Sequence, residues 1–154
     1  MEFRKLILAF VFLLPFSLLM AQNDWQTNLE NAVAQAKTEN KSVLLLFTGS
    51  DWCPPCKMLE KNVFSSETFE KYAADNLILV KADFPRKPEN KAKQSDEQRQ
   101  YNTTIQRKFM IRGFPTTIIL DNEGKELDRT VGYPGLTPDA YIEKIEQSVH
   151  ASTN

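Results

Sequence analysis

The stretch that decides the fold covers residues 42–57, which read SVLLLFTGSDWCPPCK. Its first part, residues 43–47, is a continuous apolar run between polar residues, which is typical of a strand buried on both faces of a sheet. A helix is expected from Pro54, because the amides of a first helical turn need no partner within the helix and proline fits there. Both cysteines of the chain, Cys53 and Cys56, therefore follow a buried strand directly and lie at the start of a helix.

This placement of the two cysteines favours thiol–disulfide chemistry. The amides of the first helical turn and the positive end of the helix dipole stabilise an anion, which favours the nucleophilic thiolate of Cys53. Cys56 lies one turn further on, where it can close a disulfide and release a mixed-disulfide partner. Attack by Cys53 and resolution by Cys56 complete an exchange cycle without a cofactor. Pro55 has no N–H to offer the sulfur, so we expect only a moderate lowering of the Cys53 pKa and a reductant rather than a strong oxidant.

Other interpretations of the cysteine pair remain open from the residues alone. A structural disulfide suits an exported protein, although a bridge across two intervening residues restrains little of the unfolded chain. A zinc site usually needs four ligands, and the single histidine, His150, lies close to the end of the chain. A copper chaperone would need His or Met nearby, and Met58 is the neighbouring candidate. We expect neither a metal nor a cofactor.

The rest of the chain alternates between helical and strand patterns. The predicted elements are a helix capped by Asp24 that runs through Ala36, a helix opening at Ser65-Ser66, a strand at 77–80, paired strands at 116–120 and 126–131, and a final helix capped by Thr137. Residues 84–100 are rich in charge, and we expect a solvated loop that becomes a helix near Ser95 and ends near Phe109. This order predicts an α/β fold with a central mixed β-sheet flanked by helices.

The first residues of the chain predict export. Arg4 and Lys5 precede an apolar stretch that closes on Ala21, which is the pattern of a secretory signal cleaved after Ala21. The stretch is about 15 residues long, shorter than the ~20 that a membrane-spanning helix needs, and Pro15 would disturb such a helix. We therefore expect a signal peptide at residues 1–21, one periplasmic or secreted domain at residues 22–154, and no membrane span after cleavage. The formal net charge of −1 argues against nucleic acid as the main partner.

Two segments, Phe47-Thr48-Gly49-Ser50-Asp51-Trp52-Cys53 and Asp83-Phe84-Pro85-Arg86, resemble exported single-domain bacterial members of the thioredoxin superfamily, and three motifs resemble the superfamily as a whole. The three motifs are Trp52-Cys53-Pro54-Pro55-Cys56-Lys57, Val80-Lys81-Ala82-Asp83 and Ile111-Arg112-Gly113-Phe114-Pro115-Thr116. The resemblance covers the chain from Val43 to about Val149, and it implies a thioredoxin-like fold and a thiol–disulfide oxidoreductase. Pro115 would be the cis-proline that faces the disulfide, and Phe114 would offer its backbone to the substrate as an added strand.

The same resemblance implies roles for further residues and shows one departure. Gly132 would let the substrate backbone approach closely, and Trp52 would flank the substrate groove as an apolar wall. The family places a buried aspartate six residues before the first cysteine, where this chain has Phe47. Lys81 matches the lysine that normally sits near that acid, so we expect it to lack its partner. Glu60, one turn beyond Cys56, is then a candidate proton acceptor, as is water.

The leading hypothesis is an exported reductant of protein disulfides that acts as a monomer. Its electrons would come from a membrane thiol–disulfide transporter, a partner implied by the family and by no residue of the chain. An oxidase or isomerase is an alternative within the same chemistry. A different alternative is a thioredoxin-fold binding or chaperone module, or a metallochaperone, whose two cysteines are incidental.

Several conspicuous residues outside the motifs are expected to be structural. The aromatic residues Trp25, Tyr72 and Tyr141 fall at helical spacing and predict packing. The basic residues between Lys87 and Lys93 alternate with acidic ones nearby, which favours a solvated face over an anion site. Asp51 is expected as an exposed loop residue at the rim of the cysteine site.

Overall fold

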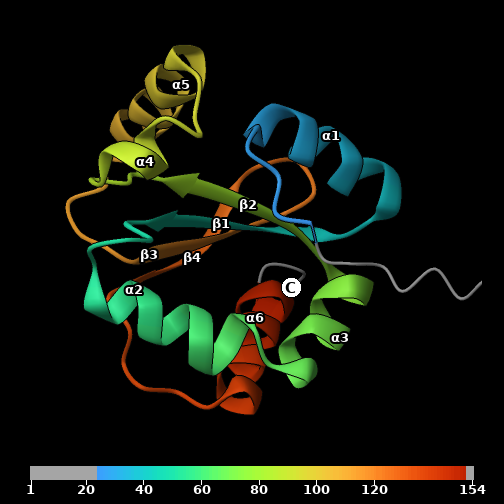
Figure 1. Ribbon diagram of the computed structural model, residues 1–154. Helices are drawn as coiled ribbons and strands as arrows, with labels where there is room; N and C mark the ends of the chain where they lie inside the picture. The colour runs from blue at the N-terminus through green and yellow to red at the C-terminus, as the bar shows by residue number, and fades with distance from the viewer. Residues whose placement is uncertain (1–23, 152–154) are drawn as a thin grey trace, which may run out of the picture.

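The computed structural model describes residues 24–151 as one α/β unit (Figure 1). The predicted signal peptide at residues 1–21 lies outside the described residues. Within the described part of the chain, none of the helices is long and apolar enough to cross a membrane.

The centre of the fold is a four-stranded sheet in the order β2-β1-β3-β4. Strand β1 (Ser42–Thr48) pairs in parallel with β2 (Leu77–Asp83) and antiparallel with β3 (Thr116–Leu120). Strand β4 (Glu126–Val131) pairs antiparallel with β3, as the predicted hairpin requires. The sheet is therefore mixed, and the prediction of a central mixed sheet is confirmed.

Helices cover both faces of the sheet, which explains why residues 43–47 form a continuous apolar run. In Figure 1, α1 (Leu29–Glu39) and α5 (Asp96–Lys108) lie over one face, whereas α2 (Pro54–Leu59), α3 (Glu67–Asn76) and α6 (Pro138–Ala151) lie over the other. Side chains alternate along β1, so that Leu45 and Phe47 enter one core while Leu44 and Leu46 enter the other. Two cores of this kind need apolar residues at every position of the strand between them.

The start of the first helix differs from the prediction. Helix α1 is capped by Asn28, whose side chain accepts a hydrogen bond from the backbone N–H of Asn31, and Asp24 does not cap it. The backbone of Gln26 instead pairs with β2, accepting from Lys81 and donating to Leu79, each at 2.8 Å. This pairing needs extended backbone, which delays the helix until the chain has left the sheet edge.

Two further segments contain helix beyond the predicted ranges, of which the first was expected to end at Lys61. Beyond α2 the chain continues through a wider π-helical turn, η1 (Glu60–Phe64), which buries Val63 and Phe64 next to Leu59. The charged segment predicted as loop up to Ser95 contains the short helix α4 (Pro88–Lys91), which begins with a proline. The predicted start of α5 is confirmed, because the Ser95 hydroxyl accepts from the backbone N–H of Gln98.

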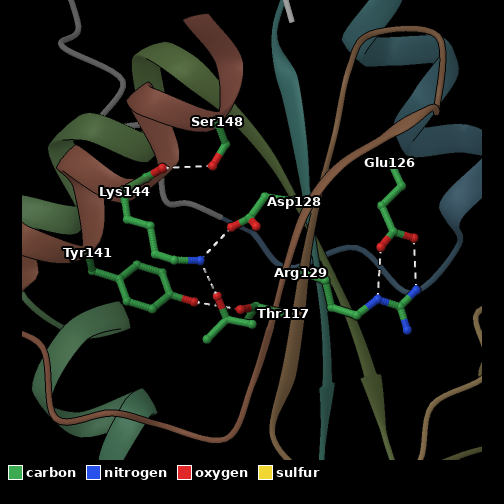
Figure 2. Close-up of polar contacts among 8 residues, drawn as sticks. Thr117, Glu126, Asp128, Arg129, Tyr141, Lys144 and Ser148 are labelled. Atoms are coloured by element: carbon green, nitrogen blue, oxygen red, sulfur yellow. Dashed lines mark hydrogen bonds and ion pairs between the residues drawn. The ribbon is translucent and has the colours of Figure 1, made fainter. Parts of the chain in front are cut away.

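The last helix is fastened to the hairpin by buried and half-buried polar contacts (Figure 2). The Tyr141 hydroxyl donates to Thr117 Oγ1 on β3 at 2.8 Å, and burial raises the pKa of that tyrosine. On β4, the Lys144 ammonium bonds to the Asp128 carboxylate and to Thr130 Oγ1. These contacts hold α6 in a fixed position across β3 and β4.

The aromatic residues expected to be structural do pack in the core below the sheet. Trp25 meets Phe64 edge-to-face with ring centroids 5.2 Å apart, and Tyr141 meets Phe64 in the same way at 5.7 Å. Tyr72 packs against the same cluster, and its partial burial raises its pKa to about 12. The packing role predicted for Trp25, Tyr72 and Tyr141 is confirmed.

Candidate active site around the disulfide

The two cysteines form a disulfide at the start of α2, with their Cα atoms 5.3 Å apart. Cys53 is the residue that caps the helix, and both side chains are buried, with 3% and 4% of their surfaces exposed. The first two helical positions are Pro54 and Pro55, which have no N–H. The backbone N–H of Cys56 is consequently the first amide of the helix to reach the Cys53 sulfur, at 3.3 Å.

The loop before β3 contains a cis peptide bond between Phe114 and Pro115. The carbonyl of Pro115 accepts a hydrogen bond from the backbone N–H of Gly132 at 2.7 Å, which joins this loop to the end of β4. Gly132 has φ +81°, and a Cβ atom at this position would have no neighbour within 4 Å. The glycine therefore adopts a left-handed backbone conformation and leaves open space beside the cis-proline.

Trp52 connects the disulfide loop to the cis-proline loop. Its ring meets the ring of Phe114 edge-to-face at 5.8 Å, and its indole N–H donates to the carbonyl of Phe84 at 2.7 Å. Phe84 in turn packs against Phe114 at 5.3 Å. A side chain on Gly49 would come within 2.4 Å of the indole, so only glycine allows Trp52 to occupy this position. The structure brings Trp52 into contact with Phe114, the residue before Pro115, and their role in a substrate groove stays a prediction.

Asp51 is not a free rim residue, and the prediction made for it is wrong. Its Oδ1 atom accepts from the backbone N–H of Arg86 at 3.0 Å, and its Oδ2 atom accepts from the N–H of Lys87 at 2.9 Å and the Asn90 amide at 3.1 Å. These donors, led by the Arg86 N–H, lower the pKa of Asp51 to about 2. The carboxylate thus anchors the segment that leads into α4 against the disulfide loop.

Lys81 has a partner, contrary to the expectation from the missing aspartate. Its ammonium lies 3.1 Å from Glu60 Oε2 and 4.5 Å from the centroid of the Trp25 ring. Phe47, at the position where the family has its aspartate, is fully buried in the opposite core. The acidic group that pairs with Lys81 has therefore moved from the strand to the helix that bears Cys56.

A cavity of about 350 Å³ lies beside Cys56 and this ion pair. It is lined by Cys56, Glu60 and Lys81, together with Thr48, Ser50, Lys57, Lys61 and Ser65. The Glu60–Lys81 pair and Cys56 therefore border the same space.

Metal binding has no support in this geometry. Over the described residues 24–151, no three His, Cys, Asp or Glu side chains are grouped so that they could hold a metal ion.

Comparison with known proteins identifies the family. Residues 29–148 match the family model of the thioredoxin-like domain. The chain belongs to the thioredoxin-like family. Among relatives of this thioredoxin-like chain, the disulfide bond reductase DsbH of Chlamydia pneumoniae is 34% identical over 84% of this chain and 74% of that protein. A solved structure of a DsbH oxidoreductase agrees with the fold at a TM-score of 0.73 and 33% identity, over 82% of this chain and 84% of that one.

A second relative is much longer than this thioredoxin-like chain. The thiol:disulfide interchange protein DsbD of Photorhabdus laumondii is 33% identical over 68% of this chain, which corresponds to only 16% of that protein. The similarity to both relatives confirms the prediction of a thiol–disulfide oxidoreductase of the thioredoxin superfamily.

Two features of the site were missed by sequence reasoning. They are the anchoring of the α4 segment by Asp51 and the pairing of Lys81 with Glu60. The partners of Asp51 lie 35 to 39 residues away, and Lys81 lies 21 residues from Glu60, so no local pattern joins them. The one available signal was the helical spacing of Glu60 from Cys56, which places the carboxylate on the same side of the helix as the sulfur.

Proposed function

We propose that the protein is an exported disulfide reductant in which Cys53 attacks a substrate disulfide and Cys56 resolves the intermediate. The observation that carries this proposal is the disulfide at the start of α2, whose neighbour Trp52 contacts Phe114 in the loop with the cis-proline. The similarity to a protein named as a disulfide bond reductase supports reduction as the direction.

In the proposed cycle the reduced protein acts first through Cys53. Its thiolate attacks one sulfur of the substrate disulfide, forms a mixed disulfide and displaces the other substrate sulfur as a thiolate. Cys56 then loses its proton and attacks Cys53, which releases the second substrate sulfur and leaves the Cys53–Cys56 disulfide seen in the structure. Two electrons pass to the substrate, and a thiol donor must return them before the next cycle.

The loop beside the disulfide is the proposed substrate site. In this proposal the backbone of Phe114 pairs with an extended substrate segment, and the open space at Gly132 supports a close approach of that segment. Trp52 and Phe114 supply an aromatic surface next to the attacking sulfur. The substrates in this proposal are proteins that carry a disulfide in an accessible, extended segment.

The Glu60 and Lys81 pair is the proposed proton acceptor for Cys56. Resolution needs the Cys56 thiolate, and the buried sulfur has no neighbouring aspartate from β1 because Phe47 stands there. Glu60 lines the same cavity as Cys56, and Lys81 holds its carboxylate in place at 3.1 Å. A general base within reach of the thiol through one water is sufficient for this step.

The similarity to part of the thiol:disulfide interchange protein DsbD supports a place in a thiol–disulfide exchange pathway, and the electron donor in this proposal is a membrane thiol–disulfide transporter. Such a partner would present a dithiol to the Cys53–Cys56 disulfide outside the cytosol. This requires export, for which the signal pattern at residues 1–21 is the support.

The test of the proposed function is the reduction of insulin by the mature chain with a dithiol as electron source. We expect catalysis by the wild type, none by Cys53→Ser, and a trapped mixed disulfide with Cys56→Ser. The reduction potential gives the direction, because a value near about −270 mV suits a reductant whereas one near about −120 mV suits an oxidase. If the variant with both Cys53→Ser and Cys56→Ser still bound its partners or acted as a chaperone, the protein would instead be a binding or chaperone module.

A further inference from the structure

Arg86 lies against the aromatic surface that precedes the attacking cysteine. Its guanidinium carbon is 3.5 Å from the centroid of the Trp52 ring, which is close stacking of a cation on an indole face. The backbone N–H of Arg86 donates to the Asp51 carboxylate, and this hydrogen bond fixes the backbone from which the stacked side chain extends. The charged segment after β2 thus places a positive charge against Trp52, the residue before Cys53.

The charge of Arg86 is not neutralised inside the molecule. Its side chain is exposed, and no carboxylate among residues 24–151 forms an ion pair with it. Asp51, which lies next to Trp52 in the chain, has both oxygens already bonded to N–H donors. An arginine stacked on an aromatic ring keeps its outward N–H groups available for a carboxylate.

Two other segments bring further positive charge to the same site. Lys57 lies one turn into the helix that Cys53 caps, and Arg112 precedes the loop of Gly113 to Pro115. Both are exposed, and no ion pair of either one occurs within the described chain. Although the whole chain has a net charge of −1, three segments around the disulfide each present a cation.

We propose that Arg86 is a specificity-determining residue that selects substrate segments with an acidic side chain next to the reacting cysteine. The stacked guanidinium and the acidic side chain would pair as the substrate sulfur approaches Cys53. The attraction acts on the encounter and its orientation, because charges at the rim of an interface change association rates more than residence times. This inference rests on Cys53 being the attacking sulfur of the proposed function.

The test uses the Cys56→Ser form of the mature chain and short peptides whose single cysteine carries a 2-pyridyl disulfide. The Cys53 thiolate attacks the peptide sulfur, a mixed disulfide forms, and pyridine-2-thione leaves with the electron pair of the broken S–S bond. Any reactive thiolate performs this exchange, so the rate can be measured even if the protein reduces no protein disulfide. Paired peptides carry Glu or Gln on either side of the cysteine.

We expect the second-order rate constant at low salt to favour the Glu peptide over the Gln peptide about two- to fivefold, the range that exposed ion pairs provide. Arg86→Met should bring the ratio close to one. Arg86→Lys should keep part of the preference, because the charge remains and the flat stacking on Trp52 is lost. A substitution that changes the reactivity of Cys53 itself changes the rate constants of the Glu and Gln peptides equally. The ratio of the two rate constants therefore reports only the preference for the acidic side chain.

Lys125→Met is the matched control, since it removes one exposed positive charge from the turn at the far end of β3. The ratio should stay at the wild-type value in this variant. A wild-type ratio of one, a ratio that Arg86→Met leaves unchanged, or an equal loss in Lys125→Met would each overturn the inference. Failure to reduce insulin together with a normal peptide ratio would overturn the proposed function and leave the inference standing.

Discussion

Gly49 contributes to the site by leaving space for a neighbour. Trp52 occupies the position where a side chain on this residue would lie, and the indole is fixed on its other side by the hydrogen bond to Phe84. We expect Gly49→Ala to displace the indole and to lower the free energy of unfolding by about 1–3 kcal/mol, as overpacking does. Denaturant unfolding and Trp52 fluorescence check this prediction.

Gly113→Ala is the control for that substitution. A methyl group there would meet Val131 at 3.6 Å, which is ordinary contact, and the residue has no positive φ. Its unfolding free energy should stay within about 0.5 kcal/mol of the wild type. If both variants lost the same stability, the displaced indole would not be the cause.

The second prediction at this scale concerns Glu60. Glu60→Gln keeps the size of the side chain and removes the base, so release of a peptide from its mixed disulfide with Cys53 should slow by about tenfold or more at neutral pH. The rate should recover as the pH rises, because Cys56 then ionises without a base. Attack by Cys53 on an activated disulfide should change little. Stopped-flow measurement of the two steps separates them.

Glu67→Gln is the matched variant for this experiment, because Glu67 pairs only with exposed Lys71 on α3. It should release the peptide at the wild-type rate. An unchanged rate in Glu60→Gln would show that water, and no carboxylate, accepts the proton from Cys56.

At the scale of elements, the α4 segment depends on a single carboxylate. Removal of the Asp51 charge by Asp51→Asn should increase hydrogen exchange of residues 84–94, because the N–H groups of Arg86 and Lys87 lose an anionic acceptor. Exchange of β1 should remain at the wild-type level. Equal exchange of residues 84–94 in both proteins would contradict the anchoring role.

Acid should release the same segment. The pKa of Asp51 is lowered to about 2, below the value of ~3.9 for an unfolded aspartate, so ionisation favours the anchored state. This contribution is complete above about pH 4 and is lost as the pH falls towards 2. Peptide-resolved exchange across that range should show residues 84–94 opening in the wild type and a weaker pH dependence in Asp51→Asn.

The attachment of α6 to the hairpin gives another prediction (Figure 2). Tyr141→Phe removes the buried hydrogen bond to Thr117 and should lower the unfolding free energy by about 1–2 kcal/mol. The double variant with Thr117→Val should cost less than the sum of the single changes, since no polar group then remains buried without its partner. Strictly additive costs would show that the bond contributes nothing to the pair.

The elements that could be predicted are those whose signal is local. Strand β1 was predictable because burial on both faces requires an unbroken apolar run, and α5 because Ser95 provides its own cap. Helix α4 was missed because its position depends on Asp51, which is remote in the sequence. The start of α1 was misplaced for a similar reason, since the pairing of Gln26 with β2 cannot be read from residues 24–28.

The same distinction holds for the candidate site. The cysteine pair and the cis-proline stand in short motifs, so their residues were predictable together with the chemistry. The partner of Lys81 was not, because an ion pair between a strand and a helix depends on how the two pack. Arg86 belongs to the predicted solvated segment and to the Asp83-Phe84-Pro85-Arg86 resemblance, but nothing in its neighbourhood in the sequence indicates its contact with the Trp52 ring.

At the scale of the whole molecule, the prediction concerns processing and export. Expression of the full chain in a Gram-negative host should give a periplasmic protein that begins at Gln22, because the pattern up to Ala21 is that of a cleaved signal. Fractionation and N-terminal mass spectrometry check this. A product that keeps residues 1–21 and stays with the membrane fraction would contradict the prediction of a cleaved signal.

The short pairing of Gln26 with β2 has a consequence for how the folded molecules behave towards one another. An uncovered strand at the margin of a sheet invites strands from other copies, and this is a common route to aggregation. Gln26 occupies part of the β2 margin, while β4 at the opposite margin carries the charged residues Glu126, Asp128 and Arg129. Both margins are thus unattractive to a second copy, and the folded molecules should resist edge-to-edge association.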